Sequence, residues 1–93
     1  MTTFEYDQAK SMSNMDKHGI DFNEAAALWS DPGIIEIPAA TVDETRFLAV
    51  GRIDGKCWTA VATLRGENIR IISVRRARKN EEAIYEDHNS KGI

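Results

Sequence analysis

The chain of 93 residues predicts one α+β domain that spans residues 1–93. Two observations support this fold class. Apolar residues recur at helical spacing in the first third of the chain, whereas β-branched runs separated by turn residues follow from Ile34 onward. A last polar segment, from about Lys79 to His88, has the length of one more helix. Helices before and after a run of hairpin-connected strands are typical of an α+β meander.

The N-terminal residues predict a short strand and two capped helices. Phe4 to Tyr6 suit the strand, and Asp7 supplies an N-cap for a helix from about Gln8 to His18. Gly19 suits the left-handed conformation that commonly ends a helix. The second helix starts at an approximate capping box, continues along an apolar stripe and stops at a turn. These features are, in order, Asp21 with Glu24, then Phe22, Ala25, Ala26 and Trp29, then Asp31-Pro32-Gly33.

From Ile34 onward the pattern predicts strands. Ile34, Ile35 and Ile37 precede Pro38, which suits an edge strand because proline cannot donate a hydrogen bond to a neighbouring strand. Two turns then predict consecutive hairpins. Asp54-Gly55 joins strands over Thr45–Ile53 and Lys56–Leu64, and Arg65-Gly66-Glu67-Asn68 leads into a strand over Ile69–Arg75. In this last strand, regular alternation places Ile69, Ile71, Ser73 and Arg75 on one face and Arg70, Ile72, Val74 and Arg76 on the other.

The final helix is weakly amphipathic. Its only clearly aliphatic residues are Ala83 and Ile84, so we expect it to pack loosely on the rest of the domain because little apolar area holds it there.

Positive charge is concentrated in one short block. The chain has a net charge of −3, yet residues 65–79 hold six of its 12 basic residues against one acidic residue, Glu67. Local potential decides polyanion binding more than net charge does, so this block can hold a nucleic-acid backbone. The alternative is that its arginines pair with acidic residues elsewhere on the surface.

The composition excludes several classes of protein. No stretch approaches the roughly 20 apolar residues of a membrane span. The first ten residues contain no apolar run, so we expect no secretory signal, and a lone cysteine, Cys57, suits a reducing cytoplasm. We expect Cys57 to be a small core residue. The two histidines, His18 and His88, have no His or Cys at ligand spacing, so we expect neither a metal site nor a cofactor.

Cleavage of RNA without a metal needs a base, an acid and cations around the phosphate. The end of the first helix offers such groups, because Lys17 places a cation beside the imidazole of His18, the side-chain type that titrates near neutral pH. The alternative is that both residues only interact with the negative end of the helix dipole.

The end of the last strand and the helix after it offer a second set. Arg75 and Arg76 point to opposite sides if the strand continues, so only one of them can reach a given phosphate. Glu81 and Tyr85 lie four residues apart and share one helix face. The alternatives are a surface acid paired with an arginine for Glu81 and a packing aromatic for Tyr85.

Two further cations lie near turns. Arg46 shares a strand face with Glu44, where the two side chains can also neutralise each other. Arg65 lies at the turn of the second hairpin.

Together these residues resemble the BrnT family of toxins, which is related to the RelE-like ribonucleases. The ordered set of matching residues carries the resemblance, and it covers about residues 4 to 86. The matching residues are Phe4-Glu5-Tyr6-Asp7, Ala9-Lys10, Asn14, Lys17-His18-Gly19-Ile20, Phe22, Ala25, Asp31-Pro32, Glu44, Arg46-Phe47, Gly51, Ile69-Arg70-Ile71-Ile72-Ser73, Arg75-Arg76-Ala77, Glu81 and Tyr85. Three residues depart from the usual pattern: Tyr6 replaces Trp, Gln8 replaces Pro, and Arg78 replaces a Thr that caps the last helix.

The resemblance implies a RelE-like α+β fold and a ribonuclease toxin of a type II toxin–antitoxin pair that halts translation in the cytoplasm. It implies a BrnA-like antitoxin as the partner, in an assembly such as a heterotetramer, with operator DNA contacted only through the antitoxin complex. We hypothesise a catalytic set in which four arginines stabilise the phosphate, one or more of three residues exchange protons, and Lys17 assists. The arginines are Arg46, Arg65, Arg75 and Arg76, and the candidates for proton exchange are His18, Glu81 and Tyr85. The hypothesised substrate-binding set is Arg70, Arg78 and Lys79. We expect that removing the charge of Arg75 or of His18 abolishes growth inhibition and leaves the fold intact.

Two alternatives belong to other classes. A catalytically inactive binding module would use the same arginines to hold an acidic antitoxin or a nucleic acid, because a guanidinium fork suits carboxylate and phosphate alike. A metal-dependent nuclease would need a carboxylate cluster that the sequence lacks.

Overall fold

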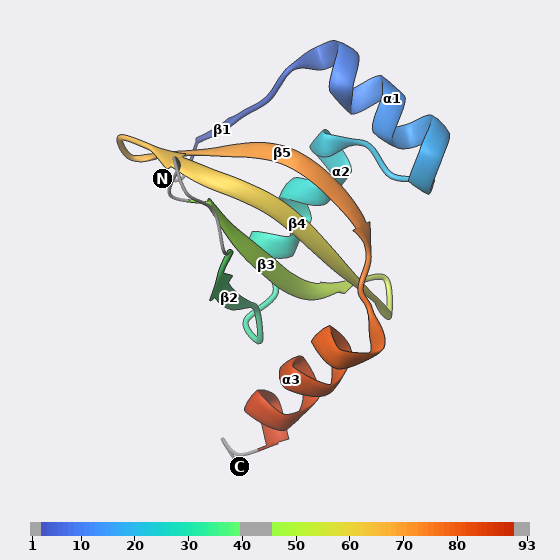
Figure 1. The fold of residues 1–93 in the computed structure, drawn as a ribbon, viewed down its shortest axis with the longest axis vertical. Coiled ribbons are helices and arrows are strands. Elements are labelled where there is room, and N and C mark those ends of the chain that lie inside the picture. Colours follow the sequence, from blue (N-terminus) through green and yellow to red (C-terminus); the bar gives the residue numbers. More distant parts are fainter. Residues whose placement is uncertain (1–2, 40–45, 91–93) are drawn as a thin grey trace.

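The computed structural model describes residues 3–39 and 46–90 and confirms the α+β class. Within these residues the chain forms helices on both faces of a five-stranded mixed sheet (Figure 1). The helices are α1 (Gln8–His18), α2 (Phe22–Ala25), the 3-10 helix η1 (Ala26–Ser30) and α3 (Lys79–Ser90). The strands are β1 (Phe4–Glu5), β2 (Ile35–Pro38), β3 (Arg46–Ile53), β4 (Lys56–Arg65) and β5 (Asn68–Arg76). No described helix has both the length and the apolar character that crossing a bilayer requires.

The strands lie in the order β1-β5-β4-β3-β2. The meander of β3, β4 and β5 is antiparallel as predicted, and β2 is the predicted edge strand beside β3. The predicted turn at Asp54 and Gly55 is also confirmed, since their φ angles of 50° and 79° are those of a type I′ hairpin turn. The predicted strand start at Thr45 lies outside the described residues. β1 lies parallel to β5 at the other edge of the sheet, with Phe4 beside Ile69.

Helix α1 begins and ends as predicted. Asp7 Oδ1 accepts hydrogen bonds from the backbone N–H groups of Ala9 at 2.9 Å and Lys10 at 3.2 Å. Gly19 takes the left-handed conformation, with φ of 76°, and ends the helix there because side-chain-bearing residues rarely adopt this conformation.

The predicted second helix is in fact two short helices, which changes the stripe that faces the core. The predicted capping box is present, with bonds of 2.7 and 3.2 Å between Asp21 and Glu24. After Ala25 the chain tightens into η1, where a turn takes about three residues rather than about 3.6. The fully buried residues are therefore three apart, and they are Phe22, Ala25 and Leu28. Ala26 and Trp29 of the predicted stripe are only partly buried.

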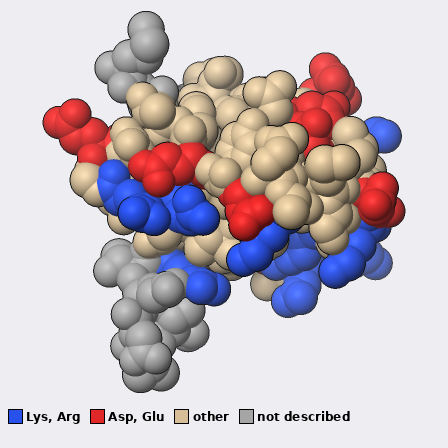
Figure 2. Space-filling view, turned by 90° about the horizontal axis from the view of Figure 1, so that it is seen from above, with Lys and Arg blue, Asp and Glu red and all other residues tan. Residues whose placement is uncertain are grey.

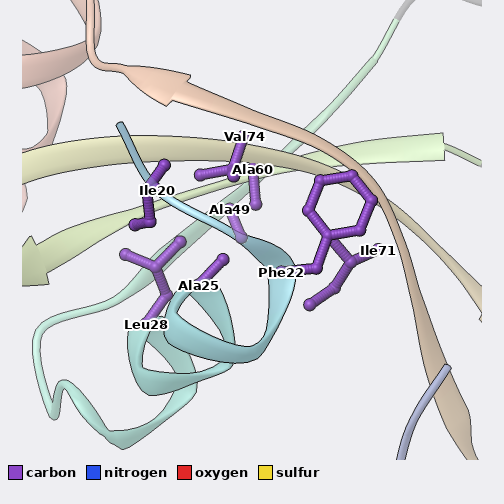
Figure 3. Packing of buried hydrophobic residues seen from close by; sticks show 8 residues of the cluster. All are labelled: Ile20, Phe22, Ala25, Leu28, Ala49, Ala60, Ile71 and Val74. Carbon is purple, nitrogen blue, oxygen red and sulfur yellow. The ribbon is translucent and has the colours of Figure 1, made fainter. Parts of the chain in front are cut away.

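The main core lies between the sheet and the α2–η1 segment (Figure 3). Ala49 of β3 and Ala60 of β4 are completely buried beneath this segment, and their small side chains leave room for the larger Phe22 and Leu28. Gly51 extends this close approach, because a Cβ atom there would lie 3.2 Å from Leu28 Cδ2. The cluster consists of Ile20, Phe22, Ala25, Leu28, Ala49, Ala60, Ile71 and Val74.

A β-bulge in β5 changes which of its side chains face the core. The register shifts between Val61 and Ala62 of β4, which leaves Ile72 of β5 as the extra residue. Val74 is therefore completely buried in the core, whereas regular alternation predicted Ser73 on that face. The predicted assignment of faces is correct before the bulge and wrong beyond it.

Helix α1 lies along the edge of β5 beyond β1. Its Asn14, only 7% exposed, donates from Nδ2 to the carbonyl oxygens of Val74 and Ile20, both at 2.9 Å. Asn14 Oδ1 also accepts a hydrogen bond of 3.2 Å from the amide of Val74. One side chain thus satisfies both backbone polar groups of Val74.

Helix α3 packs on the opposite face of the sheet from α2 through two polar residues. Glu81 and Tyr85 are 4% and 6% exposed, which confirms that they share one helix face. Ala83 and Ile84, the two aliphatic residues on which the expectation of loose packing was based, are both exposed. The helix is attached instead by the ring of Tyr85, which packs with Ile35, Val50 and Cys57, and by the polar contacts of Glu81 and of the Tyr85 hydroxyl.

Candidate active site

One face of the sheet packs against α2 and η1, and the other face carries most of the predicted arginines. Residues directly opposite one another on neighbouring strands share a face. Arg46, Thr63 and Arg70 are therefore together on the second face, because Thr63 pairs with both arginines. Thr59 pairs with Arg75 further along the same face. Helix α3 lies over the Thr59 end, and a pocket lies at the Arg46 end.

This pocket, which we call the basic pocket, has a volume of about 480 Å³. Four of its residues are cations, and each comes from a different element of the fold. Its lining consists of Lys10 of α1, Arg46 of β3, Thr63, Leu64 and Arg65 of β4, and Arg70 and Ile72 of β5. Figure 2 shows that the visible Lys and Arg side chains gather mainly along one side of the molecule. Four cations around one pocket favour an anionic ligand there, although the net charge of the chain is −3.

Two guanidinium groups of the basic pocket share one carboxylate. Glu5 Oε1 lies 3.7 Å from Arg65 Nε and 3.8 Å from Arg70 Nη1. Asn68 Nδ2 donates a hydrogen bond of 2.6 Å to the other carboxylate oxygen of Glu5. Both ion-pair distances exceed the usual length of a hydrogen bond, so the N–H groups of the two arginines stay available for a phosphate.

A second pocket, which we call the helix-end pocket, lies at the end of α1 and has a volume of about 210 Å³. It contains the predicted residues Lys17 and His18, both of which are exposed. Lys10 and Ile72 line this pocket and the basic pocket alike, so the two pockets adjoin. The full lining of the helix-end pocket is Lys10, Ser13, Asn14, Lys17, His18, Phe22, Ile72 and Ser73.

Arg75 of β5 and Glu81 of α3 form a largely buried ion pair, with side chains 24% and 6% exposed. The guanidinium group donates to both carboxylate oxygens, at 2.7 and 2.9 Å, in a bidentate arrangement. The hydroxyl of Thr59 and the amide of Arg78 donate to Glu81 Oε1 at 2.9 and 2.8 Å. The hydrogen bonds from Arg75 outweigh the effect of burial and, with those from Arg78 and Thr59, lower the pKa of Glu81 to about 2. The bond from the Arg78 amide is the contact that the glutamate of a capping box makes at a helix start.

Tyr85 is held at the other end of the same helix face. Its hydroxyl donates a hydrogen bond of 2.8 Å to Asp31 Oδ2, which also accepts one of 2.8 Å from the amide of Arg52. Burial, followed by the bond to Asp31, raises the pKa of Tyr85 to about 12. Burial raises the pKa of Asp31, but hydrogen bonds from Arg52, Gly33 and Tyr85 outweigh it and leave that pKa lowered. Tyr85 therefore keeps its proton at neutral pH.

The structure separates the predicted catalytic residues into groups. Lys17 and His18 lie in the helix-end pocket, and Arg46 and Arg65 lie in the basic pocket with the predicted binding residue Arg70. The other group lies under α3 and consists of Arg75, Glu81 and Tyr85. Glu44, the predicted neighbour of Arg46, lies outside the described residues.

The remaining predicted cations lie at the far end of β4 and β5. Arg76 points to the opposite side from Arg75, as predicted, and its guanidinium lies 5.4 Å from the ring centroid of Trp58. Trp58 is seven residues from Arg65 along β4, or about 23 Å at about 3.3 Å per residue. Arg76 and Arg65 therefore cannot contact the same phosphodiester. Arg78 and Lys79 are exposed where β5 leads into α3.

Comparison with models of protein families shows which family this chain resembles. The family described as the ribonuclease toxin BrnT of type II toxin–antitoxin systems matches residues 6–81. The chain belongs to the BrnT family. No curated protein matches the chain. The matched residues include all four cations of the basic pocket and both predicted residues of the helix-end pocket, whereas Tyr85 lies beyond the match.

The sites of this BrnT chain include residues to which sequence analysis assigned no role. Lys10, Asn14 and Lys17 recur at i, i+4 and i+7 in α1, so helical spacing alone could have placed Lys10 on the same face as Lys17. Glu5 had no such signal, because its contacts depend on the parallel pairing of β1 with β5. The position of Ile72 depends on the bulge.

Metal ligands and Cys57 are the remaining groups with possible chemical roles in the described part of this BrnT chain. Among residues 3–39 and 46–90, no three His, Cys, Asp or Glu side chains come together as ligands for a metal ion. Cys57 is buried in the second core cluster, beneath α3, which confirms the prediction that it is a core residue. Burial raises the pKa of its thiol.

Proposed function

We propose that this BrnT protein is a metal-independent endoribonuclease whose active site is the basic pocket together with the helix-end pocket. The observation that carries the proposal is that Lys10 and Ile72 line both pockets. Five cations and an imidazole therefore border adjoining depressions, and these are the groups that RNA cleavage without a metal requires.

These groups suit attack by a ribose 2′-hydroxyl on the adjacent phosphorus. His18 takes the proton of the 2′-hydroxyl as the bond from the 2′-oxygen to phosphorus forms. The bond from phosphorus to the 5′-oxygen breaks, and that oxygen takes a proton from Lys17. The products are a 2′,3′-cyclic phosphate and a free 5′-hydroxyl. Arg46, Arg65 and Arg70 stabilise the negative charge that develops on the phosphate oxygens.

Arg75, Glu81 and Tyr85 hold α3 in this proposal and do not exchange protons with RNA. Both oxygens of Glu81 accept hydrogen bonds, and a carboxylate with a pKa of about 2 is a weak base. Tyr85 keeps its proton because its pKa is about 12. The exposed cations Arg78 and Lys79 can contact RNA further along its backbone.

We propose a BrnA-like antitoxin as the partner, since the type II toxin–antitoxin family implies an antitoxin protein. An acidic antitoxin segment would suit the basic pocket, because a guanidinium group binds carboxylate and phosphate with the same donors. A heterotetramer, contact with operator DNA only through the antitoxin complex, and a cytoplasmic location are further parts of this proposal.

The test uses purified protein with bulk bacterial RNA in the presence of EDTA. We expect cleavage that leaves 2′,3′-cyclic phosphate ends, and no cleavage of a 2′-O-methylated RNA. Arg70→Ala should lower the rate about 100-fold because it removes a donor to the developing charge. His18→Ala should have an effect of about the same size. Lys56→Ala is the control, because it removes an exposed cation at the β3–β4 turn, away from both pockets.

Two results would contradict the proposal. Loss of all cleavage in EDTA would show that a metal is needed, and full activity of Arg70→Ala and His18→Ala would place the active site elsewhere. Expression without an antitoxin separates the enzyme from an inactive binding module. The enzyme arrests growth with loss of bulk RNA, whereas the module leaves growth and RNA unchanged.

A further inference from the structure

We infer that Glu5 is a positioning residue of this BrnT active site, whose carboxylate orients the guanidinium groups of Arg65 and Arg70 towards the phosphate. The inference rests on the proposed function, because it assigns a role within the same pocket. Glu5 lies in β1, directly beside Arg70 of β5 in the parallel register. The lining of the basic pocket includes both arginines but not Glu5, so the carboxylate reaches them from outside the pocket.

The contacts form a bridge between two strands. Arg65 ends β4 and Arg70 lies near the start of β5, so the two arginines flank the hairpin turn. Oxygen Oε1 of Glu5 lies within 4 Å of both, at 3.7 and 3.8 Å. Asn68, the first residue of β5, binds the other oxygen at 2.6 Å and so fixes the orientation of the carboxylate. A long arginine side chain otherwise occupies many rotamers, and ordering it only when RNA binds would slow the reaction.

Two simpler roles account less well for this arrangement. A role in stability is weak, because the side chains of Arg65 and Arg70 are 60% and 35% exposed and exposed ion pairs contribute little to folding. A role in charge balance alone would oppose RNA binding, because an acid beside the pocket lowers its positive potential. Orientation of both arginines by one fixed carboxylate explains why an acid lies there.

The first test replaces Glu5 by glutamine, which keeps the side-chain length and an oxygen that can accept from Asn68. Cleavage is measured under single-turnover conditions, and affinity is measured with a 2′-O-methylated RNA. We expect the cleavage rate of Glu5→Gln to fall about tenfold, with an affinity equal to or tighter than that of the wild type. Charge balance alone predicts tighter binding with an undiminished rate. Glu67→Gln is the control, because it removes an acid from the same turn that, among the described contacts, takes no part in these ion pairs.

A second variant keeps the charge of Glu5 and removes only its fixed orientation. Asn68→Ala frees the carboxylate, and we expect a smaller fall in cleavage rate with unchanged affinity. If Glu5→Gln does not fold, the cleavage rate of Asn68→Ala alone tests whether Glu5 is a positioning residue. The inference is overturned if the cleavage rate of every folded variant of this pair lies within about twofold of the wild-type rate while Arg70→Ala is impaired. If Arg65→Ala and Arg70→Ala also cleave at the wild-type rate, the proposed active site itself is wrong.

Discussion

Replacing Arg75 by alanine should loosen the attachment of α3 to the sheet. The pKa of Glu81 is lowered from 4.5 to about 2 in the folded protein. At about 1.4 kcal/mol per pKa unit, the contacts of this carboxylate contribute about 3 kcal/mol to folding at neutral pH. Removing one partner of a buried ion pair commonly destabilises a protein by about 3–5 kcal/mol. We therefore expect Arg75→Ala to lower the free energy of unfolding by about 3 kcal/mol at pH 7.

The effect should depend on pH with a defined sign. The folded pKa of Glu81 lies below its unfolded value, so the contribution is complete above about pH 5 and is lost as the pH falls through about 2. Between pH 7 and pH 3, the wild type should lose about 2 kcal/mol more stability than Glu81→Gln does. The destabilisation caused by Arg75→Ala should shrink over the same range.

Urea denaturation at several pH values measures these differences, and hydrogen exchange of the α3 amides shows where stability is lost. Arg78→Ala is the matched control, because it removes an exposed guanidinium group just three residues from Arg75. The reasoning would be refuted if Arg75→Ala were within about 0.5 kcal/mol of the wild type at pH 7 with unchanged exchange in α3. The destabilisation expected here differs from the expectation, from the sequence, that removing the charge of Arg75 leaves the fold intact.

Three other predictions concern buried polar groups. Asn14→Ala should lower the free energy of unfolding by about 2–3 kcal/mol, because it leaves buried backbone groups of β5 and Ile20 unpaired. Ser13 is the exposed neighbour of Asn14, so Ser13→Ala serves as the control in urea denaturation. Equal stability of the two variants would contradict the prediction. Ultraviolet titration of the wild type should show a tyrosine that ionises at about pH 12, which Tyr85→Phe lacks, and identical titration curves would speak against the bond to Asp31. Cys57 should react slowly with a thiol reagent in the folded protein and rapidly in urea, since burial raises its pKa, whereas immediate reaction of the folded protein would mean an accessible thiol.

The elements of this fold could be predicted wherever a local signal sets them. Asp7 and Gly19 mark the ends of α1 by their own hydrogen bonds and backbone conformation, and Asp54-Gly55 sets the hairpin turn by its positive φ angles. Each of these signals acts within a few residues. The predicted position of α3 is also correct at its start, Lys79, although the residues that attach it were not foreseen.

The features that escaped prediction depend on contacts between distant residues. The 3-10 turn at η1 places Leu28 in the core against the sheet, and no residue within the turn signals the change of period. The extra residue Ile72 reverses the alternation of β5 only in relation to β4. The candidate site depends both on local signals and on contacts between distant residues. The helical position of His18 followed from the sequence, whereas the bridge from Glu5 required the pairing of the first strand with the last.

The two borders of the sheet differ in their capacity to recruit another chain. On the part of β5 that extends beyond β1, Asn14 occupies both polar groups of Val74, so an incoming strand would first have to displace α1 there. At the β2 border, the strand has only four residues and ends in Pro38, with the exposed charge of Glu36 within it. Short, charged and proline-terminated strands resist edge-to-edge aggregation. Both features disfavour intermolecular β-pairing, and loss of Asn14 would weaken that protection along β5.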